Sequence, residues 1–339
     1  MSNPDFAIPT REPEQSGRDD TILPFAVKAL DLRGRIVRLG AAIDAILGRH
    51  DYPAPVAKLL GEAVVLTVML GSALKFDGRF ILQTQSDGPV RMLVVDFTSP
   101  SNVRACARFD AERVAKAVAL GAVAPGQLLG RGHLAMTIDR GPEMSRYQGL
   151  VPLEGGDLEA AAHEYFARSE QIPTRVRLAV GEEFRAGENG ARRHWRAGGI
   201  LLQFLPASPE RARQADLPPG NAPPGTSPHV LPEDEAWAEG RAVIATVDDI
   251  ELIDPALSSE RLAYRLFHER GVRVFRTAPV NAQCSCSRAG VETMLKSFSQ
   301  RDRDDMVENG RITVTCEFCS STYVFAPHEI AASPPAAQA

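Results

Sequence analysis

The chain has 339 residues, a formal net charge of -5 and 44% hydrophobic residues. That apolar content can bury a substantial core, and the length is typical of one large domain with a small additional module. The acidic balance leaves no general excess of positive charge for phosphate backbones, so we do not expect nucleic acid as a main partner.

The N-terminal residues 1–20 are polar and contain Pro4, Pro9 and Pro13. They predict a disordered extension and not a signal peptide. The most apolar stretch, residues 63–74, is too short for a bilayer, which needs about 20 apolar residues, and is expected to form a buried helix. Without an export signal or a membrane span, we expect a cytoplasmic protein whose cysteines stay reduced.

Residues 21–206 predict the main domain. A strand is expected over 22–30, and helical apolar spacing follows over 37–47 and 54–74. Asp157 is placed to cap a helix that runs to about residue 169. Further strands are predicted over 79–85, 92–96, 103–109, 134–138, 146–151, 174–180 and 192–205. Because strands and helices come in blocks, the predicted fold class is α+β, with a large mixed, mostly antiparallel sheet.

Residues 207–232 are dense in proline and glycine and predict a flexible insertion. Residues 233–279 predict two short amphipathic helices, the second one capped by Ser259. The first helix carries a narrow apolar stripe formed by Ile244, Val247, Ile250 and Ile253. Such short helices are unstable alone and must dock on another surface. Their sparse apolar content predicts marginal docking and therefore a metastable helical linker.

The clearest chemical signal lies in residues 280–330. Four of the five cysteines form two close pairs, Cys284-Ser-Cys286 and Cys316-Glu-Phe-Cys319. Two such pairs can supply the four thiolates of a tetrahedral zinc site, so we predict one zinc ion per chain. A module this small has a poor core, whereas zinc binding can contribute about 10–16 kcal/mol. Loss of the metal should therefore unfold this C-terminal domain.

The first cysteine pair also allows redox chemistry. In an extended chain, residues two apart have Cα atoms about 6.5 Å apart, close enough to share a metal and at the upper limit for a disulfide. Cys284 and Cys286 could thus bind zinc when reduced or form a labile disulfide when oxidised. A redox switch and a purely structural zinc ribbon both fit this spacing. The fifth cysteine, Cys106, is expected to be a buried apolar residue in its strand.

Other functional classes fit less well. A zinc-ribbon regulator that binds nucleic acid is the main alternative, but Arg301 and Arg303 alternate with acidic residues and make no basic patch. Four cysteines close the coordination position that a zinc hydrolase must keep open, so the protein is not expected to be an enzyme. The sequence also lacks a Gly-x-x-x-x-Gly-Lys phosphate loop, which argues against ATP-driven activity.

Motifs along roughly residues 20–330 together resemble the redox-regulated heat-shock holdase chaperones of 33 kDa, the 33 kDa chaperonin family. These motifs are GLVPLEG at 149–155, SEQIPT at 169–174, GGILLQ at 198–203, LFHE at 266–269 and VTCEFC at 314–319. The N-terminal extension and the proline-rich insertion are the departures from the family pattern.

The resemblance implies a cytoplasmic, ATP-independent holdase with an α+β core, a metastable linker and a zinc-binding switch domain. In the reduced, inactive form, zinc would be held by Cys284, Cys286, Cys316 and Cys319. In the active form, the disulfides Cys284–Cys286 and Cys316–Cys319 would replace the zinc site, and the switch domain and linker would unfold. The exposed apolar surface would bind unfolding client proteins as a homodimer, with no nucleic-acid or membrane partner. Residues 331–339 are expected to form a disordered tail.

Overall fold

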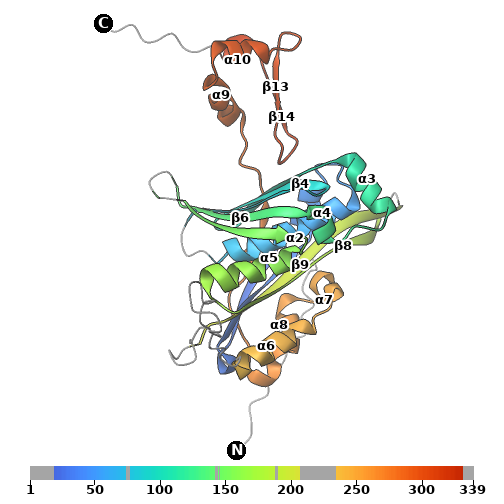
Figure 1. Cartoon of the computed structure of the whole chain (residues 1–339), viewed down its shortest axis with the longest axis vertical. Helices are drawn as coiled ribbons and strands as arrows, with labels where there is room; N and C mark the ends of the chain where they lie inside the picture. The colour runs from blue at the N-terminus through green and yellow to red at the C-terminus, as the bar shows by residue number, and fades with distance from the viewer. Residues whose placement is uncertain are drawn as a thin grey trace, which may run out of the picture.

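The computed structural model describes residues 19–73, 77–141, 144, 146–187, 190–206 and 234–330. Most of the predicted N-terminal extension, the predicted insertion at 207–232 and the tail at 331–339 lie outside these ranges. Figure 1 shows a body of sheets and helices, with a small C-terminal lobe standing apart at one end. The predicted α+β class is confirmed.

The first sheet of the body has six strands. Its order is β10 (Arg273–Val274), β1 (Thr21–Val27), β2 (Leu32–Leu39), β9 (Gly190–Phe204) and β8 (Thr174–Gly187), and β11 (Ala278–Pro279) also pairs with β1. All of these pairings are antiparallel. The long β8–β9 hairpin forms one edge of this sheet.

The second sheet also has six strands. Its order is β12 (Asn281–Ala282), β5 (Asn102–Phe109), β4 (Val90–Thr98), β3 (Arg79–Ser86), β6 (Arg131–Asp139) and β7 (Tyr147–Glu154). Among the described strands, only β12 pairs in parallel, with β5. The two sheets thus confirm the predicted antiparallel character. The lobe adds a hairpin of β13 (Ile312–Thr315) and β14 (Thr322–Phe325).

The helix α2 (Ala54–Gly71) forms the centre of the body (Figure 1). It packs against strands of both sheets, and its apolar residues join one core with side chains from each. In the described part of the chain, α2 is the one helix long and apolar enough to cross a bilayer, and 78% of it is buried inside the protein. The buried helix predicted from the apolar stretch is confirmed, although it ends before residue 74.

The remaining helices lie around the sheets. They are α1 (Ala41–Leu47), α3 (Ala111–Ala119), α4 (Pro125–Leu129), α5 (Leu158–Tyr165), α6 (Glu235–Ala245), α7 (Asp249–Ile253), α8 (Ser259–Phe267), α9 (Arg288–Lys296) and α10 (Gln300–Asp305). Short turns of helix complete the described elements: η2 (Lys28–Leu30), η3 (Phe166–Glu170), η4 (His268–Arg270) and η5 (Pro327–Glu329). Asp157 caps α5 as predicted, since its side chain accepts a hydrogen bond from the Ala160 N–H. The helices α3 and α4 were not predicted.

Three predictions near the N-terminus were wrong. The strand expected over 22–30 ends at Val27, and Lys28–Leu30 form the helical turn η2. Residues 37–39 belong to β2 and not to a helix, because β2 runs on to Leu39 and α1 starts only at Ala41. Asp19 and Asp20 are not part of a disordered extension. The Asp20 carboxylate accepts the Gly40 and Ala42 N–H groups at the start of α1, at 2.9 and 3.0 Å.

The linker region forms three helices instead of the two predicted. Asp248 starts a new helix through a capping box with Glu251, which separates α6 from α7. The predicted stripe is therefore broken: Ile244 and Val247 are buried, but Ile250 is 68% exposed. Ser258, and not Ser259, caps α8 by accepting the Arg261 N–H at 3.3 Å.

The linker helices α6, α7 and α8 cover one face of the first sheet (Figure 1). Their buried contacts are Trp237, Ile244, Val247, Leu252, Leu262, Ala263, Leu266 and Phe267. Trp237 lies 6.4 Å from Phe204 and Phe267 lies 5.7 Å from Phe25, measured between ring centroids. The docked surface is thus more apolar than the predicted stripe alone.

Candidate metal centre

The four cysteines predicted to bind zinc come together in the C-terminal lobe. Cys284 and Cys286 precede α9, while Cys316 and Cys319 lie in the turn between β13 and β14. Their sulfur atoms all lie within 4.8 Å of one another. The Cys284–Cys316 and Cys286–Cys319 sulfur separations are 3.8 and 3.3 Å. Zn–S bonds of about 2.3 Å in a tetrahedron give sulfur separations of about 3.8 Å, so this donor set fits a zinc ion.

Local hydrogen bonds make the four thiols chemically unequal. Partial burial raises the pKa of Cys319, but hydrogen bonding with the Ser321 side chain and backbone and with the neighbouring sulfurs lowers it to about 6. At Cys286 the net pKa shift has the opposite direction. The Tyr323 hydroxyl, 3.2 Å away, favours the thiolate, yet partial burial and the neighbouring sulfurs raise the pKa of Cys286 to about 12. The opposite shifts favour the thiolate form at Cys319 over the thiolate form at Cys286.

The lobe has few apolar contacts of its own. Its fully buried apolar side chains are Leu295, Ile312, Phe325 and Ile330. Ser287 caps α9 by accepting the Gly290 N–H at 3.1 Å. Phe298 lies beyond the end of α9 at Lys296 and is 39% exposed, so it adds little to this core. So small a core is consistent with a lobe that depends on a metal ion.

Short strands connect the cysteines to the linker. After α8 the chain forms β10 and β11 on the first sheet and then β12 on the second sheet. Cys284 follows β12 by two residues. The path from the metal site to α8 therefore runs through pairings only two residues long, which a change in the lobe can loosen one after another.

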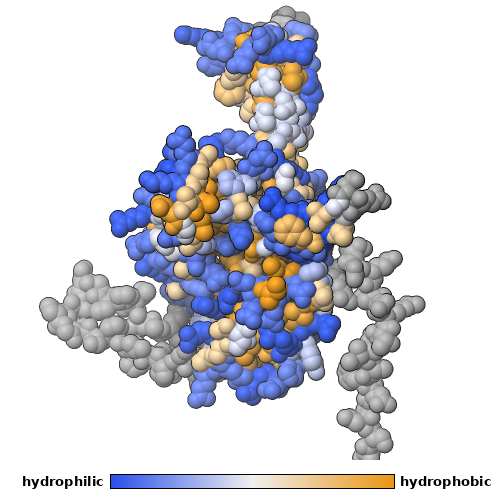
Figure 2. All heavy atoms as spheres, turned by 90° about the vertical axis from the view of Figure 1, so that its right-hand side faces the viewer, coloured by the Kyte–Doolittle hydropathy of each residue, from blue (hydrophilic) through white to orange (hydrophobic). Residues whose placement is uncertain are grey.

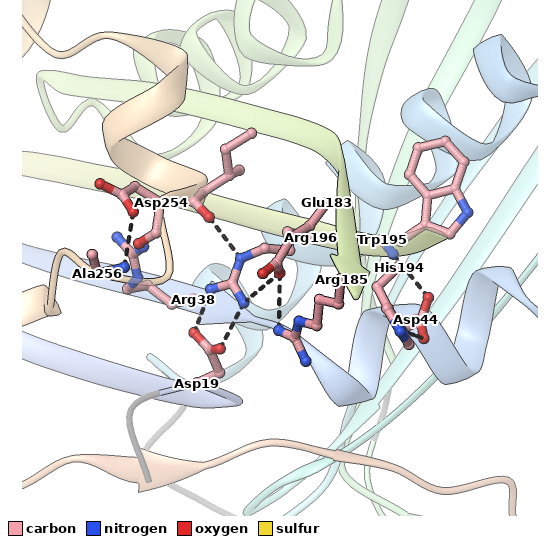
Figure 3. Close-up of polar contacts among 12 residues, drawn as sticks. Asp19, Arg38, Asp44, Glu183, Arg185, His194, Trp195, Arg196, Asp254 and Ala256 are labelled. Atoms are coloured by element: carbon pink, nitrogen blue, oxygen red, sulfur yellow. Dashed lines mark hydrogen bonds and ion pairs between the residues drawn. The ribbon is translucent and has the colours of Figure 1, made fainter. Parts of the chain in front are cut away.

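Two buried arginines attach the linker helix α7 to the first sheet (Figure 3). Arg38 on β2 donates to the carbonyl oxygens of Glu251 and Asp254, and its side chain is among the largest that are fully buried. Arg196 on β9 donates from Nε to the Ile253 carbonyl at 2.6 Å. Positive charge at a helix C-terminus is stabilising, because the last carbonyls have no partner within the helix.

The Arg196 guanidinium has a second set of partners. Its two Nη atoms donate to both carboxylate oxygens of Asp19, at 2.8 and 2.7 Å, and Glu183 lies 3.5 Å away (Figure 3). Neither arginine was predicted from the sequence to contact the linker. The available signals were a charged residue inside the apolar run of β2 and an arginine two residues before the GGILLQ motif.

A glycine allows α7 to approach this closely. A Cβ atom added to Gly198 would lie 2.0 Å from the Leu252 carbonyl oxygen. Gly198 is the first residue of the GGILLQ motif, so the motif provides the space in which α7 docks.

Sequence comparisons agree with the architecture. The family model described as Hsp33 protein matches residues 20–326. The 33 kDa chaperonin of Caulobacter vibrioides is 46% identical over 318 residues, which cover 93% of this chain and 97% of the relative. The 33 kDa chaperonin of Pseudomonas aeruginosa strain UCBPP-PA14 is 35% identical over 309 residues, covering 91% and 92%.

A solved structure has the same fold. The crystal structure of the 33 kDa chaperonin (heat shock protein 33 homolog) from Thermotoga maritima superposes with a TM-score of 0.67 at 21% identity, and covers 92% of this chain and 96% of its own. The fold, the four-cysteine lobe and these matches define a molecular chaperone and not an enzyme. A chaperone acts by binding client proteins. The chain belongs to the Hsp33 family.

Proposed function

We propose that this protein is a redox-regulated, ATP-independent holdase of the cytoplasm that binds unfolding proteins during oxidative and heat stress. In the reduced protein, Cys284, Cys286, Cys316 and Cys319 hold one zinc ion, and the linker helices stay docked. The observation that carries this proposal is the meeting of four sulfur atoms within 4.8 Å in a lobe with a small core.

Oxidation removes the metal ligands. Cys284 with Cys286, and Cys316 with Cys319, each form one disulfide. Each pair of thiolates loses two electrons as its disulfide forms. These electrons, with two protons from the solvent, reduce one hydrogen peroxide to two water molecules. A disulfide sulfur is a far weaker ligand than a thiolate, so the lobe loses its metal and much of its stability.

Unfolding of the lobe then reaches the linker through the short strands β12, β11 and β10. Release of α6, α7 and α8 would uncover an apolar sheet face. Its residues are Leu23, Phe25, Leu32, Ile36, Ile200, Leu202 and Phe204. In the docked state the viewed side of the body is largely hydrophilic, with separate apolar patches (Figure 2). A continuous apolar face of this kind is suited to unfolded segments of client proteins. We propose that the active form is a homodimer.

The proposal is tested by two parallel measurements on the reduced protein. Hydrogen peroxide is added at mildly elevated temperature, and zinc release is followed with a chromogenic chelator while light scattering follows a heat-unfolded client protein. We expect zinc release and suppression of scattering to rise together. Zinc that stays bound, with no gain in anti-aggregation activity, would support a static zinc ribbon instead.

Cysteine variants distinguish the effect of oxidising the four-cysteine cluster from the effect of oxidising any other thiol. Cys106→Ser is the matched control, because Cys106 lies on β5 outside the cluster and is 4% exposed. It should respond to peroxide as the wild type does. Cys316→Ser should bind zinc more weakly and have a looser lobe without oxidant. Normal metal binding by Cys316→Ser would contradict the proposed ligand set.

A further inference from the structure

The second cysteine pair rests against the body. The Ser320 hydroxyl donates to the Arg49 carbonyl at 3.0 Å, and Glu317 pairs with Arg108 on β5 at 2.5 Å. The turn at residues 316–320 therefore contacts the edge of the second sheet and the loop between α1 and α2. The body thus contacts the turn that carries the second pair of cysteines.

Arg104 on β5 is the central residue of this contact. Its Cζ atom lies 4.1 Å from the centroid of the Phe318 ring, between the second pair of cysteines. Its Nη1 atom lies 3.9 Å from the Cys284 sulfur, in the first pair. One side chain of the body thus contacts both cysteine-bearing segments.

A buried acid holds the Arg104 side chain in this position. Arg104 donates from Nε and Nη2 to one carboxylate oxygen of Asp96, at 2.9 and 2.6 Å, and Asp96 is 5% exposed. The strand register fixes the neighbouring backbone, because β12 and β5 pair Asn281 with Asn102 and Ala282 with Val103. Arg104 is the next residue of β5, beside the segment that leads to Cys284.

The charge of the metal centre explains why the position of Arg104 matters. Four thiolates around one Zn²⁺ carry a net charge of about -2. A guanidinium remains protonated and offers N–H donors to ligand sulfurs, and such outer partners raise metal affinity. An N–H donor also draws electron density from a sulfur and makes it a poorer nucleophile towards peroxide.

We propose that Arg104 is a positioning residue through which the body raises the zinc affinity of the four cysteines and delays their oxidation. The inference rests on the proposed function, since it assigns a regulator to the same centre. Thermodynamic linkage makes the effect reciprocal: whatever Arg104 adds to zinc binding, bound zinc adds to the docking of residues 316–320 on the body. Loss of the metal then also releases the turn from β5.

The test measures zinc affinity in the reduced full-length chain by competition with a chromogenic chelator. Arg104→Met removes the charge and the donors but keeps the aliphatic bulk. We expect about a tenfold loss of zinc affinity, the lower end of the range for an outer partner of a metal ligand. Arg104→Lys should show a smaller loss, since it keeps the charge but not the flat contact with Phe318. Both variants should release zinc to peroxide faster than the wild type.

The matched control is Arg108→Met on the same strand. The side chains of Arg108 and its partner Glu317 are 60% and 58% exposed. An exposed pair of this kind contributes little, so zinc affinity should stay within about twofold of the wild type.

Further variants separate positioning from a structural role, because Arg104→Met leaves the buried Asp96 unpaired. The double variant Arg104→Met with Asp96→Asn removes that cost. Phe318→Leu weakens the stacking from the lobe side and leaves the body intact. Both should still lose zinc affinity. The difference in zinc affinity between Arg104→Met and the wild type should become smaller at about 1 M salt, where charges are screened within about 3 Å.

Wild-type zinc affinity in Arg104→Met and in Phe318→Leu would overturn the inference, whether or not the body melts at a lower temperature. The proposed function would stand if those proteins still lost zinc and gained activity on oxidation. Conversely, weaker zinc binding by the variants, in a protein that gains no chaperone activity with peroxide, would support the role of Arg104 and defeat the proposed function.

Discussion

Arg196 on β9 and Ile253 at the end of α7 are joined by a hydrogen bond of 2.6 Å from the guanidinium to the backbone carbonyl. The Arg196 side chain is only 3% exposed, so α7 itself keeps water from this charge. A buried guanidinium is costly when its partners are removed and it stays buried. Here, release of α7 takes the Ile253 carbonyl away from Arg196 and at the same time lets water reach the guanidinium. The linker release that we propose would therefore leave no buried unpaired charge.

The first prediction concerns Arg38, which donates hydrogen bonds to two carbonyl groups of the α7 region. Arg38→Met should weaken linker docking by about 1.5–3 kcal/mol, the usual contribution of hydrogen bonds to a charged group. Amide hydrogen exchange in residues 249–254 should accelerate correspondingly in the reduced, zinc-bound protein. Arg33→Met, at an exposed position near the start of the same strand, is the control and should exchange as the wild type does. Unchanged exchange in Arg38→Met would show that the arginine does not hold the linker.

A second prediction concerns the close approach of α7 at Gly198. Gly198→Ala should destabilise the docked linker by about 1–3 kcal/mol, because the added Cβ would lie 2.0 Å from the Leu252 carbonyl oxygen. Denaturant unfolding of the reduced protein measures the change. Gly156→Ala is the matched control, since its Cβ would lie at an ordinary 3.5 Å from the Ala160 side chain. Equal effects of the two substitutions would contradict a specific role for Gly198.

The elements that were predicted correctly are those with a strong local pattern. The strands β3 to β7 contain short apolar-rich runs that lie between turn residues, and the four cysteines have metal-site spacing within short segments. Residues 37–39 were misassigned because a buried Arg38 between Val37 and Leu39 looks like the polar side of a helix. Its charge is accommodated only by partners from a distant segment, which no local pattern shows.

The contacts that these arginines make with the linker and with the cysteine cluster are long-range. Arg38 meets Glu251 at a sequence separation of 213 residues, and Arg104 meets Cys284 at a separation of 180. Nothing in the spacing of either arginine indicates its partner, because the pairing is created by the sheets. The linker was underestimated for a related reason: its apolar residues, including Trp237 and Leu252, follow no single helical stripe and bury themselves from three separate helices.

A third prediction uses the two tryptophans of the chain. Trp237 on the linker helix α6 is 8% exposed and lies against Phe204 of the first sheet. In a Trp195→Phe variant, Trp237 is the only remaining tryptophan. Its emission should shift to longer wavelength when peroxide releases the linker, and should return after reduction with zinc present. Emission that stays constant while zinc is lost would show that the linker remains docked.

A fourth prediction concerns Glu62 on the central helix α2. Burial, followed by repulsion from Glu159, Asp157 and Asp249, raises the pKa of Glu62 to about 8, while Lys58 opposes the shift. The folded protein thus keeps a proton that an unfolded chain releases above its ordinary pKa of 4.5. The stabilisation is complete below that value and is lost as the pH rises through about 8. Allowing for partial exposure, the loss should be about 2 kcal/mol.

Glu62→Gln removes this dependence, because an amide cannot ionise. The variant should match the wild type near pH 4.5 and exceed its free energy of unfolding at pH 8. Asp249 lies on α7, so the same substitution should slow amide exchange of the linker at the higher pH. Glu112→Gln, on the exposed side of α3, controls for the loss of one negative charge. A stability difference between wild type and Glu62→Gln that is equal at both pH values would contradict the assignment, because a simple packing effect does not titrate.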